Sequence, residues 1–282
     1  MPADTMFHSV WMQDLTWEDI ESYIDEHEDP TVIVPIGSTE QHGPHLPLGV
    51  DAYQAIGIAE ETAKAADVLT APPIWYGDAN HHLAFPGTMS LSTQTVISVL
   101  KDIYTSLIHH GVTNIVTING HRLANLPAIE IASKQTKEDH PDAFFATVDL
   151  VRAAVRLHRD LREGDEESGF HGGEFETSFI MARHPELVKE DRIQKSEETS
   201  SWTRFASNDY VNIDDSIQTA SSHHDWAEDA MGHQGDPTFA SPEKGEELIE
   251  GIVANIVEFL GDVEGLREAQ RSDDGESLGL TY

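Results

Sequence analysis

The chain has 282 residues, of which 39% are hydrophobic, so it is long enough to bury one large core. It has no cysteine, which excludes disulfides, thiolate nucleophiles and every sulfur-ligated metal site. With 51 acidic and 17 basic residues its formal charge is −34, and this balance disfavours binding to nucleic acid and to anionic membrane surfaces.

Predicted strands and helices alternate along the first part of the chain. A short helix is predicted from residue 16 to 27, and the β-branched run at 31–36, TVIVPI, is typical of a buried strand. Apolar residues then recur at helical spacing from 51 to 66, and a short strand at 68–71 ends before two prolines. These segments indicate a first β-loop-α-β unit.

The same alternation continues toward the C-terminus. A helix is predicted at 92–110, where Gly111 ends it, and a second buried strand, NIVTI, at 114–118. A loop at 119–125 starts the next helix, and a further strand is expected at 144–148. Helical patterns recur at three later ranges: 149–161, 173–183 and 241–260. The expected fold class is therefore α/β, a three-layer α/β/α sandwich with a mainly parallel sheet.

No internal repeat or linker divides the sequence, so residues 1–282 are expected to form a single domain. The polar, serine-rich segment 194–237 lacks a clear period and is predicted to be a long loop or lid. Acidic residues are spread along the chain, which indicates a solvated surface that suits concentrated salt, where short screening lengths weaken self-repulsion. No stretch approaches the roughly 20 apolar residues that span a bilayer. We therefore expect a cytoplasmic protein in a high-salt cytosol.

Histidines follow two of the predicted strands, at the sheet edge where α/β proteins bind ligands. In Glu40-Gln41-His42, an extended backbone would send a carboxylate and an imidazole to the same side, where both can bind one cation. Asp51 opens the following helix, and a carboxylate there can bridge two metal ions. The alternative is that Glu40 and Asp51 are capping or surface acids and that His42 is an ordinary loop histidine.

Two later clusters offer further ligands. His121 follows the strand at 114–118 and would reach the same sheet edge as Glu40 if the two strands are neighbours. His171 and Glu174 are three residues apart and would share one face of a helix, whereas Glu176 would point elsewhere unless the turn is irregular. On spacing alone, this third cluster is equally well explained as a helix start with acidic residues near its N-terminus.

Five side chains together form a ligand set for two divalent cations: Glu40, His42, Asp51, His121 and Glu174. Two such cations would lower the pKa of a bridging water toward about 7 and clamp a carbonyl oxygen, which is what amide hydrolysis requires. A metal-bridging hydroxide would then attack the amide. His171 is the candidate proton shuttle to the leaving nitrogen.

The three clusters, in this order, resemble the creatininase (creatinine amidohydrolase) family. The matching segments cover most of the chain: 35–47, 85–88, 119–121, 171–178 and 235–237. The resemblance implies a single α/β/α domain, often assembled as a homo-hexamer, and a site that holds zinc or manganese. By this resemblance, the family's metal ligands match Glu40, His42, Asp51 and His121. The catalytic histidine of the family matches His171, and a further acid that supports the site matches Glu176.

Two departures from the creatinine-cleaving members weaken the case for creatinine as the substrate. Those members carry a ligand glutamate just after the second histidine, whereas 122–125, RLAN, contains no acid, and Glu174 is expected to supply the ligand instead. They also cover the substrate with tryptophans, one shortly before the catalytic histidine, and residues 151–170 contain none. His81 and His82 precede the match at 85–88 and are expected to shape the pocket rather than bind metal.

The expected function is hydrolysis of a C–N bond in a small cyclic or linear amide, in the manner of a creatinine amidohydrolase and outside ordinary peptide bonds. One alternative within the family is a formamide deformylase of pyrimidine or cofactor biosynthesis. An alternative of another class is a non-catalytic metal-binding scaffold, which would need no proton shuttle at His171. The expected partners are a small-molecule amide and other copies of the chain, with no nucleic acid and no membrane.

Overall fold

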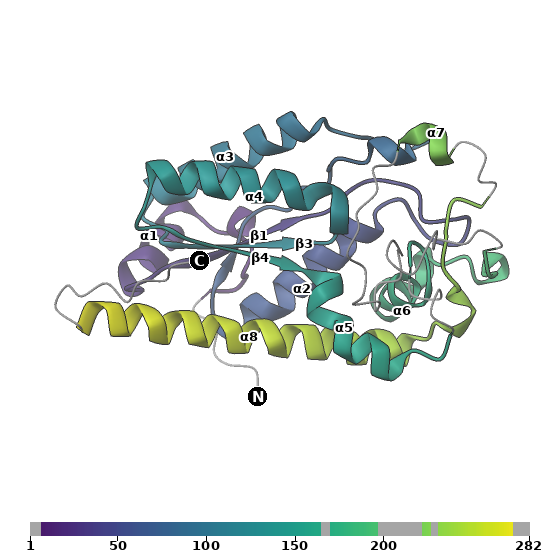
Figure 1. Ribbon diagram of the computed structural model, residues 1–282. Coiled ribbons are helices and arrows are strands. Elements are labelled where there is room, and N and C mark those ends of the chain that lie inside the picture. The colour runs from purple at the N-terminus through teal and green to yellow at the C-terminus, as the bar shows by residue number, and fades with distance from the viewer. Residues whose placement is uncertain (1–6, 165–169, 197–221, 227–230, 273–282) are drawn as a thin grey trace.

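The fold is built on a four-stranded sheet in which every strand pairing is parallel. The computed structural model describes residues 7–164, 170–196, 222–226 and 231–272, whose arrangement is shown in Figure 1. The strands of this part of the chain are β1 (Thr31–Ile36), β2 (Leu69–Thr70), β3 (Asn114–Asn119) and β4 (Phe144–Asp149). They lie in the order β2-β1-β3-β4, and the register pairs Ile36 with Asn119, so that β1 and β3 end level with each other.

Helices cover both faces of this sheet. Their bounds are α1 Trp17–Glu26, α2 Val50–Ala66, α3 Thr93–His109, α4 Arg122–Asp139, α5 Leu150–Leu161, α6 Glu174–Arg183 and α8 Pro242–Ser272. Ile33 packs on one face with residues of α2, α5, α6 and α8, whereas Val32, Val34 and Ile36 pack on the other with residues of α1, α3 and α4. Figure 1 shows α3 and α4 on one side of the strands and α2 and α8 on the other. The expected three-layer α/β/α sandwich is confirmed.

Short helical turns lie in the connections of the described residues. They are α7 His223–Trp226, η1 Met12–Asp14, η2 Asn80–His82, η3 Pro185–Leu187, η4 Glu190–Arg192 and η5 Pro237–Phe239. The predicted long loop or lid at 194–237 includes α7, but most of it lies outside the described residues. Its role stays a prediction, and so does the single domain over residues 1–282. Among the described helices, none is both long and apolar enough to cross a membrane.

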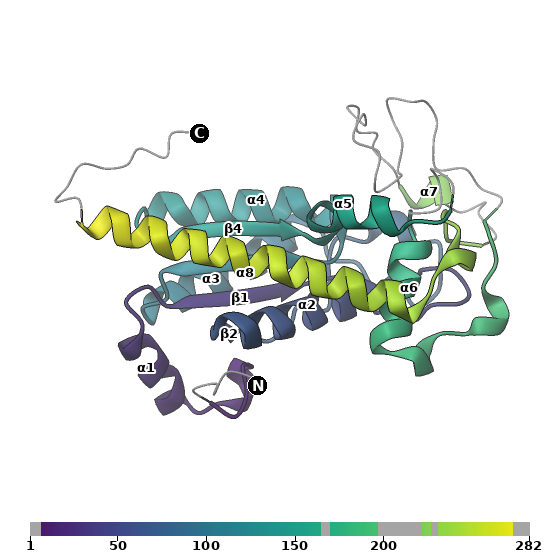
Figure 2. The same cartoon turned by 90° about the horizontal axis from the view of Figure 1, so that it is seen from below.

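The last helix is longer than its sequence pattern predicts. It was expected to end at residue 260, yet α8 continues to Ser272 and runs along the length of the sheet (Figure 2). Arg267 explains the extension, because its guanidinium donates hydrogen bonds to Asn114 Oδ1 at 3.1 Å and to the Asp142 carbonyl at 3.0 Å. These contacts tie the end of α8 to the amino end of β3.

The carboxyl ends of β1 and β3 mark the point where the order of the strands reverses. The chain leaves β1 through α2 to reach β2 on one side, and it leaves β3 through α4 to reach β4 on the other. Because α2 and α4 cover opposite faces, the loops after β1 and β3 diverge. In open α/β sheets, this is the place where ligands bind.

Two glycines let the start of α2 lie against both of these strand ends. A Cβ on Gly37, just after β1, would be 2.3 Å from the Ala52 nitrogen, and one on Gly120, just after β3, would be 2.0 Å from the Asp51 carbonyl oxygen. Since only glycine permits so close an approach of two backbones, the sequence brings the first turn of α2 to this edge. Asp51 lies in that turn.

Candidate metal centre

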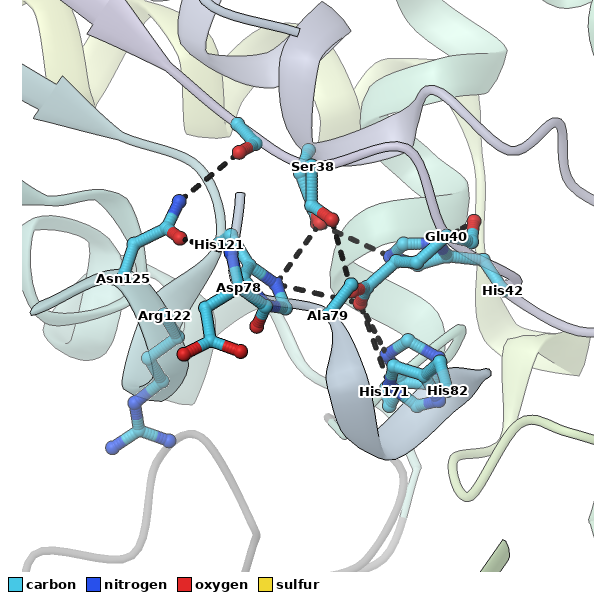
Figure 3. A network of polar contacts seen from close by, with 12 residues as sticks. Ser38, Glu40, His42, Asp78, Ala79, His82, His121, Arg122, Asn125 and His171 are labelled. Carbon is cyan, nitrogen blue, oxygen red and sulfur yellow. Dashed lines mark hydrogen bonds and ion pairs between the residues drawn. The ribbon is translucent and has the colours of Figure 1, made fainter. Parts of the chain in front are cut away.

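The carboxylate of Glu40 lies at the centre of the site, in the loop after β1 (Figure 3). Its Oε2 accepts a hydrogen bond from Ser38 Oγ at 3.1 Å. Its Oε1 faces three imidazoles, at 3.4 Å from His121 Nδ1, 3.4 Å from His82 Nε2 and 4.0 Å from His171 Nδ1. Because Glu40 is only 1% exposed, its charge must be balanced by these groups or by a bound cation rather than by water.

Asp51 joins the ligands that follow the two strands. Its Oδ1 lies 3.2 Å from Nε2 of His42, which belongs to the loop after β1, and its Oδ2 lies 3.1 Å from Nδ1 of His121, which follows β3. The Oδ2 atom is buried and makes no hydrogen bond of ordinary geometry within the described part of the chain. A carboxylate between two imidazoles, with one oxygen toward each, has the arrangement of a bridging ligand.

The acid that lies beside His42 and Asp51 is Glu176, not Glu174. Glu176 Oε2 is 3.7 Å from His42 Nε2 and accepts a hydrogen bond from the Gly172 nitrogen at 2.6 Å. Glu174 Oε1 instead accepts a hydrogen bond from Lys244 Nζ at 2.6 Å, and both of its oxygens accept backbone N–H groups of 163 and 164.

The start of α6 explains why the sequence pattern favoured Glu174. The predicted helix began at 173 with His171 close to it, so that His171 and Glu174 would share a face. The observed helix begins at Glu174 after an extended Gly173, and His171 lies outside it. Glu174 and Glu176 are two positions apart and therefore project from opposite sides of α6.

The backbone orients each of the three histidines that the sequence singled out. His42 Nδ1 is 3.2 Å from the Glu40 carbonyl, His121 Nε2 is 3.0 Å from the Asp78 carbonyl, and His171 Nε2 is 2.7 Å from the Gln41 carbonyl. Because a carbonyl can only accept, these nitrogens carry the hydrogen. When a ring is neutral, its other nitrogen carries the lone pair and lies toward the acids, as in histidines that bind metal.

Gln41 and His82 belong to the site, although sequence reasoning gave Gln41 no role and His82 only that of shaping the pocket. Gln41 Nε2 lies 2.9 Å from His82 Nδ1, 3.0 Å from His171 Nε2 and 2.6 Å from the Gly232 carbonyl. The ring of His82 stacks on that of His171, with centroids 4.4 Å apart and planes 14° apart. The sequence signal for a role of Gln41 was its position between Glu40 and His42, two expected ligands.

The segment around the predicted 235–237 match closes over the His171 loop. The Gln234 nitrogen donates to the His171 carbonyl at 2.9 Å. The buried ring of His233 packs against Gly43 and Gly172, both of which have positive φ, and a Cβ on Gly172 would be 2.6 Å from His233 Cβ. Residues 232–235 therefore hold the loop after β1 and the loop before α6 in a fixed relation.

Burial and the carboxylates set the protonation of these groups. Burial raises the pKa of Glu40 to about 8. Burial opposes the charged forms of His42 and His121, but neighbouring carboxylates outweigh it and raise the pKa of His42 to about 10 and of His121 to about 9. Burial lowers the pKa of His171 well below its ordinary value. Near neutral pH Glu40, His42 and His121 therefore hold protons that a cation would replace, whereas His171 is neutral.

The donors in this site fit divalent cations. Among the described residues, three groups offer ligand atoms that all lie within 4.8 Å of one another: Glu40, His81 and His121; Glu40, His42 and His171; and His42, Asp51 and Glu176. Imidazole nitrogens with carboxylate oxygens are the donor set that zinc and manganese use in a cysteine-free protein. The buried Asp51 Oδ2, which lacks a well-aligned hydrogen bond, is the atom that a cation would satisfy.

Comparisons with known proteins agree with the resemblance. The family model for creatininase, creatinine amidohydrolase, matches residues 13–260. Creatinine amidohydrolase of Pseudomonas putida is 30% identical over 207 residues, which cover 67% of this chain and 77% of the relative. The mycofactocin precursor peptide peptidase of Mycolicibacterium smegmatis is 28% identical over 250 residues, which cover 84% and 88% of the two chains.

Solved structures give the same result at the level of the fold. A mutant creatininase of the Zn–Zn type matches with a TM-score of 0.75 and 26% identity, over 91% of this chain and 98% of that one. A creatininase Mn structure matches with a TM-score of 0.72 and 26% identity, over 90% and 98%. The expectation of a creatininase-family hydrolase is confirmed: this chain belongs to the creatininase family.

Proposed function

We propose that the protein is a metal-dependent amidohydrolase that cleaves a C–N bond of a small cyclic or linear amide, using two divalent cations, zinc or manganese. The observation that carries the proposal is the position of Asp51, with one oxygen 3.2 Å from His42 and the other 3.1 Å from His121. One carboxylate between two imidazoles is the arrangement needed to hold two cations side by side.

We assign the ligands from the groups that lie together. One cation would be held by Glu40, Asp51 and His121, and the other by His42, Asp51 and Glu176. Glu176 thus takes the ligand role that the sequence pattern assigned to Glu174, because Glu174 is engaged by Lys244. Three carboxylates and two dications leave a charge of about +1, which favours a bound anion or polarised carbonyl oxygen.

The side chains around the cations would supply the remaining chemistry. When bound, the two cations would polarise the amide carbonyl and activate a water molecule. His171 Nε2 is fixed on the Gln41 carbonyl, and this orients its Nδ1 toward Glu40 Oε1, 4.0 Å away. This nitrogen can take a proton and return it to the leaving nitrogen of the amide. The Gln41 carbonyl and the stacked ring of His82 would keep the His171 ring in that orientation.

Replacement of His171 with alanine tests the enzyme against a non-catalytic metal-binding scaffold. We expect His171→Ala to keep both cations and to lose hydrolysis by about 10²–10⁴-fold, the usual contribution of a positioned general acid or base. His109→Ala, at an exposed position on α3, is the matched control and should leave both properties unchanged. The measurements are metal analysis and a substrate screen with creatinine, formylated pyrimidines and short peptides. Undiminished hydrolysis in His171→Ala would contradict the role of this residue.

Metal binding should release protons, because the free site holds them on its ligands. The pKa of Glu40 is raised to about 8, that of His121 to about 9 and that of His42 to about 10. At pH 7 we therefore expect about two or more protons to leave when the metal-free protein takes up zinc, and the apparent affinity to fall as the pH falls. Calorimetric titration in buffers of different ionisation enthalpy measures the number. Zinc binding without proton release would show that the ligands are already deprotonated.

We also propose a homo-oligomer, a hexamer as the family resemblance implies, in a cytoplasm of high salt. Large apolar side chains are exposed along the connection between β2 and α3, which suits contact with another copy of the chain: Trp75, Tyr76, Leu83 and Met89. The net charge of −34 supports the high-salt proposal. Light scattering and unfolding in a salt series test both points, and a monomer whose stability did not change in molar salt would contradict them.

A further inference from the structure

His81 is a histidine at the site that the proposed chemistry does not use. It lies in η2, next to His82, in the connection between β2 and α3. One of its ring nitrogens lies within 4.8 Å of ligand atoms of both Glu40 and His121. Its ring is nearly parallel to that of His121, with an angle of 10° and centroids 5.7 Å apart. We propose that His81 is a further ligand of the cation held by Glu40, Asp51 and His121. This inference rests on the proposed metal-dependent function.

The backbone before η2 fixes His81 relative to the other ligands. The Asp78 carbonyl lies 3.0 Å from His121 Nε2, and the Asp78 nitrogen donates to Asn125 Oδ1 at 3.0 Å. Asn125 Nδ2 in turn donates to the Gly37 carbonyl at the end of β1, also at 3.0 Å. The segment that carries His81 is therefore bonded to the loops that carry Glu40 and His121 (Figure 3). A ligand on this segment needs no large movement to reach the cation.

The number of ligands favours a fourth donor on this cation. Glu40, Asp51 and His121 supply three protein atoms, and four ligands complete the usual tetrahedral set around zinc. A nitrogen from His81 would be the fourth, and expansion to five ligands would still admit the water that the two cations activate. The other cation, with His42, Asp51 and Glu176, would keep an open position for substrate. The two cations would then differ: the one at His81 is held more tightly, and the other exchanges more readily.

The chemistry of the donor also predicts a preference for one metal. Imidazole favours zinc, whereas carboxylate donors suit manganese. With His81 and His121, the first cation would have two nitrogen and two carboxylate ligands. We therefore assign this position to zinc in a mixture of the two metals, and His81 is the residue that determines the preference.

Four variants test the assignment with metal binding as the readout. His81→Ala removes the ring, His81→Phe keeps a flat ring that can stack on His121 but has no lone pair, and His81→Asp supplies an oxygen donor. His109→Ala is the exposed control. Each purified protein is dialysed against zinc, manganese or an equal mixture, and the bound metal is counted and titrated with a chelator.

The wild type and His109→Ala should hold two cations. The alanine and phenylalanine variants should bind one of the two cations at least about tenfold more weakly. Loss of a residue that only hydrogen-bonds to a metal ligand already lowers metal affinity by about tenfold or more, and loss of a ligand should cost at least as much. His81→Asp should recover the second cation with a higher share of manganese. If His81→Phe held both cations as the wild type does, His81 would act by stacking, and the inference would be overturned. Unchanged affinities in His81→Ala would overturn it too, whereas wild-type protein without bound metal would overturn the proposed function and this inference together.

Discussion

Replacement of Asp51 with asparagine should remove both cations and abolish hydrolysis, although the chain still folds. Asparagine has nearly the same shape but no negative charge, so it cannot bridge two dications. Both imidazoles also lose the carboxylate that lies 3.2 Å from His42 and 3.1 Å from His121. Because a metal pair contributes several kcal/mol to stabilisation of the transition state, we expect a loss of activity of about three orders of magnitude or more.

Asp149 provides a matched control for this change. It is a buried aspartate at the end of the neighbouring strand β4, and its Oδ1 accepts a hydrogen bond from the Val151 nitrogen at 3.1 Å. Asparagine can make the same cap, so Asp149→Asn should keep the fold, both cations and most of the activity. Metal analysis and hydrolysis of the best substrate from the screen compare the two variants. Two tightly held cations in Asp51→Asn would refute the bridging role.

The fold could be predicted because its signals are local. The β-branched runs at 31–36 and 114–118 are buried on both sides, which is why they show no alternation of apolar and polar residues. All six residues of β1 and all six of β3 are buried. Thr16 and Ser92 accept hydrogen bonds from backbone nitrogens and cap α1 and α3 near the predicted starts. The end of α8 was not predictable, because the contacts of Arg267 join positions far apart in the sequence.

The candidate site could be predicted only where its residues follow strand ends. Glu40, His42 and His121 lie in the loops after β1 and β3, and a parallel sheet brings those loops together whatever their detailed course. The distinction between Glu174 and Glu176 depends instead on where α6 begins: because His171 lies before the helix, the spacing of three residues does not place His171 and Glu174 on one face. The contacts of Gln41 and of the Asp78 carbonyl depend on long-range packing, so no local pattern reveals them.

Separate replacement of Glu176 and Glu174 in α6 with glutamine should show which of the two is a metal ligand and which stabilises the fold. Glu176→Gln keeps a carbonyl oxygen for the Gly172 nitrogen but removes the charge 3.7 Å from His42 Nε2. We therefore expect the cation at His42 to be lost and hydrolysis to fall by about 10²-fold or more, with the fold intact. Metal counting and thermal unfolding of the metal-free protein measure the two effects separately.

Glu174→Gln should do the opposite. It removes the charge that accepts Lys244 Nζ at 2.6 Å, and the side chain of Lys244 is only 13% exposed. Loss of a largely buried hydrogen bond between charged groups costs about 1.5–3 kcal/mol, reduced here because Glu163 Oε1 also lies 3.0 Å from Lys244 Nζ. The variant should unfold at a lower temperature yet bind two cations. If Glu174→Gln lost a cation and Glu176→Gln did not, the assignment from the sequence pattern would be right, and Glu176 would not be the ligand.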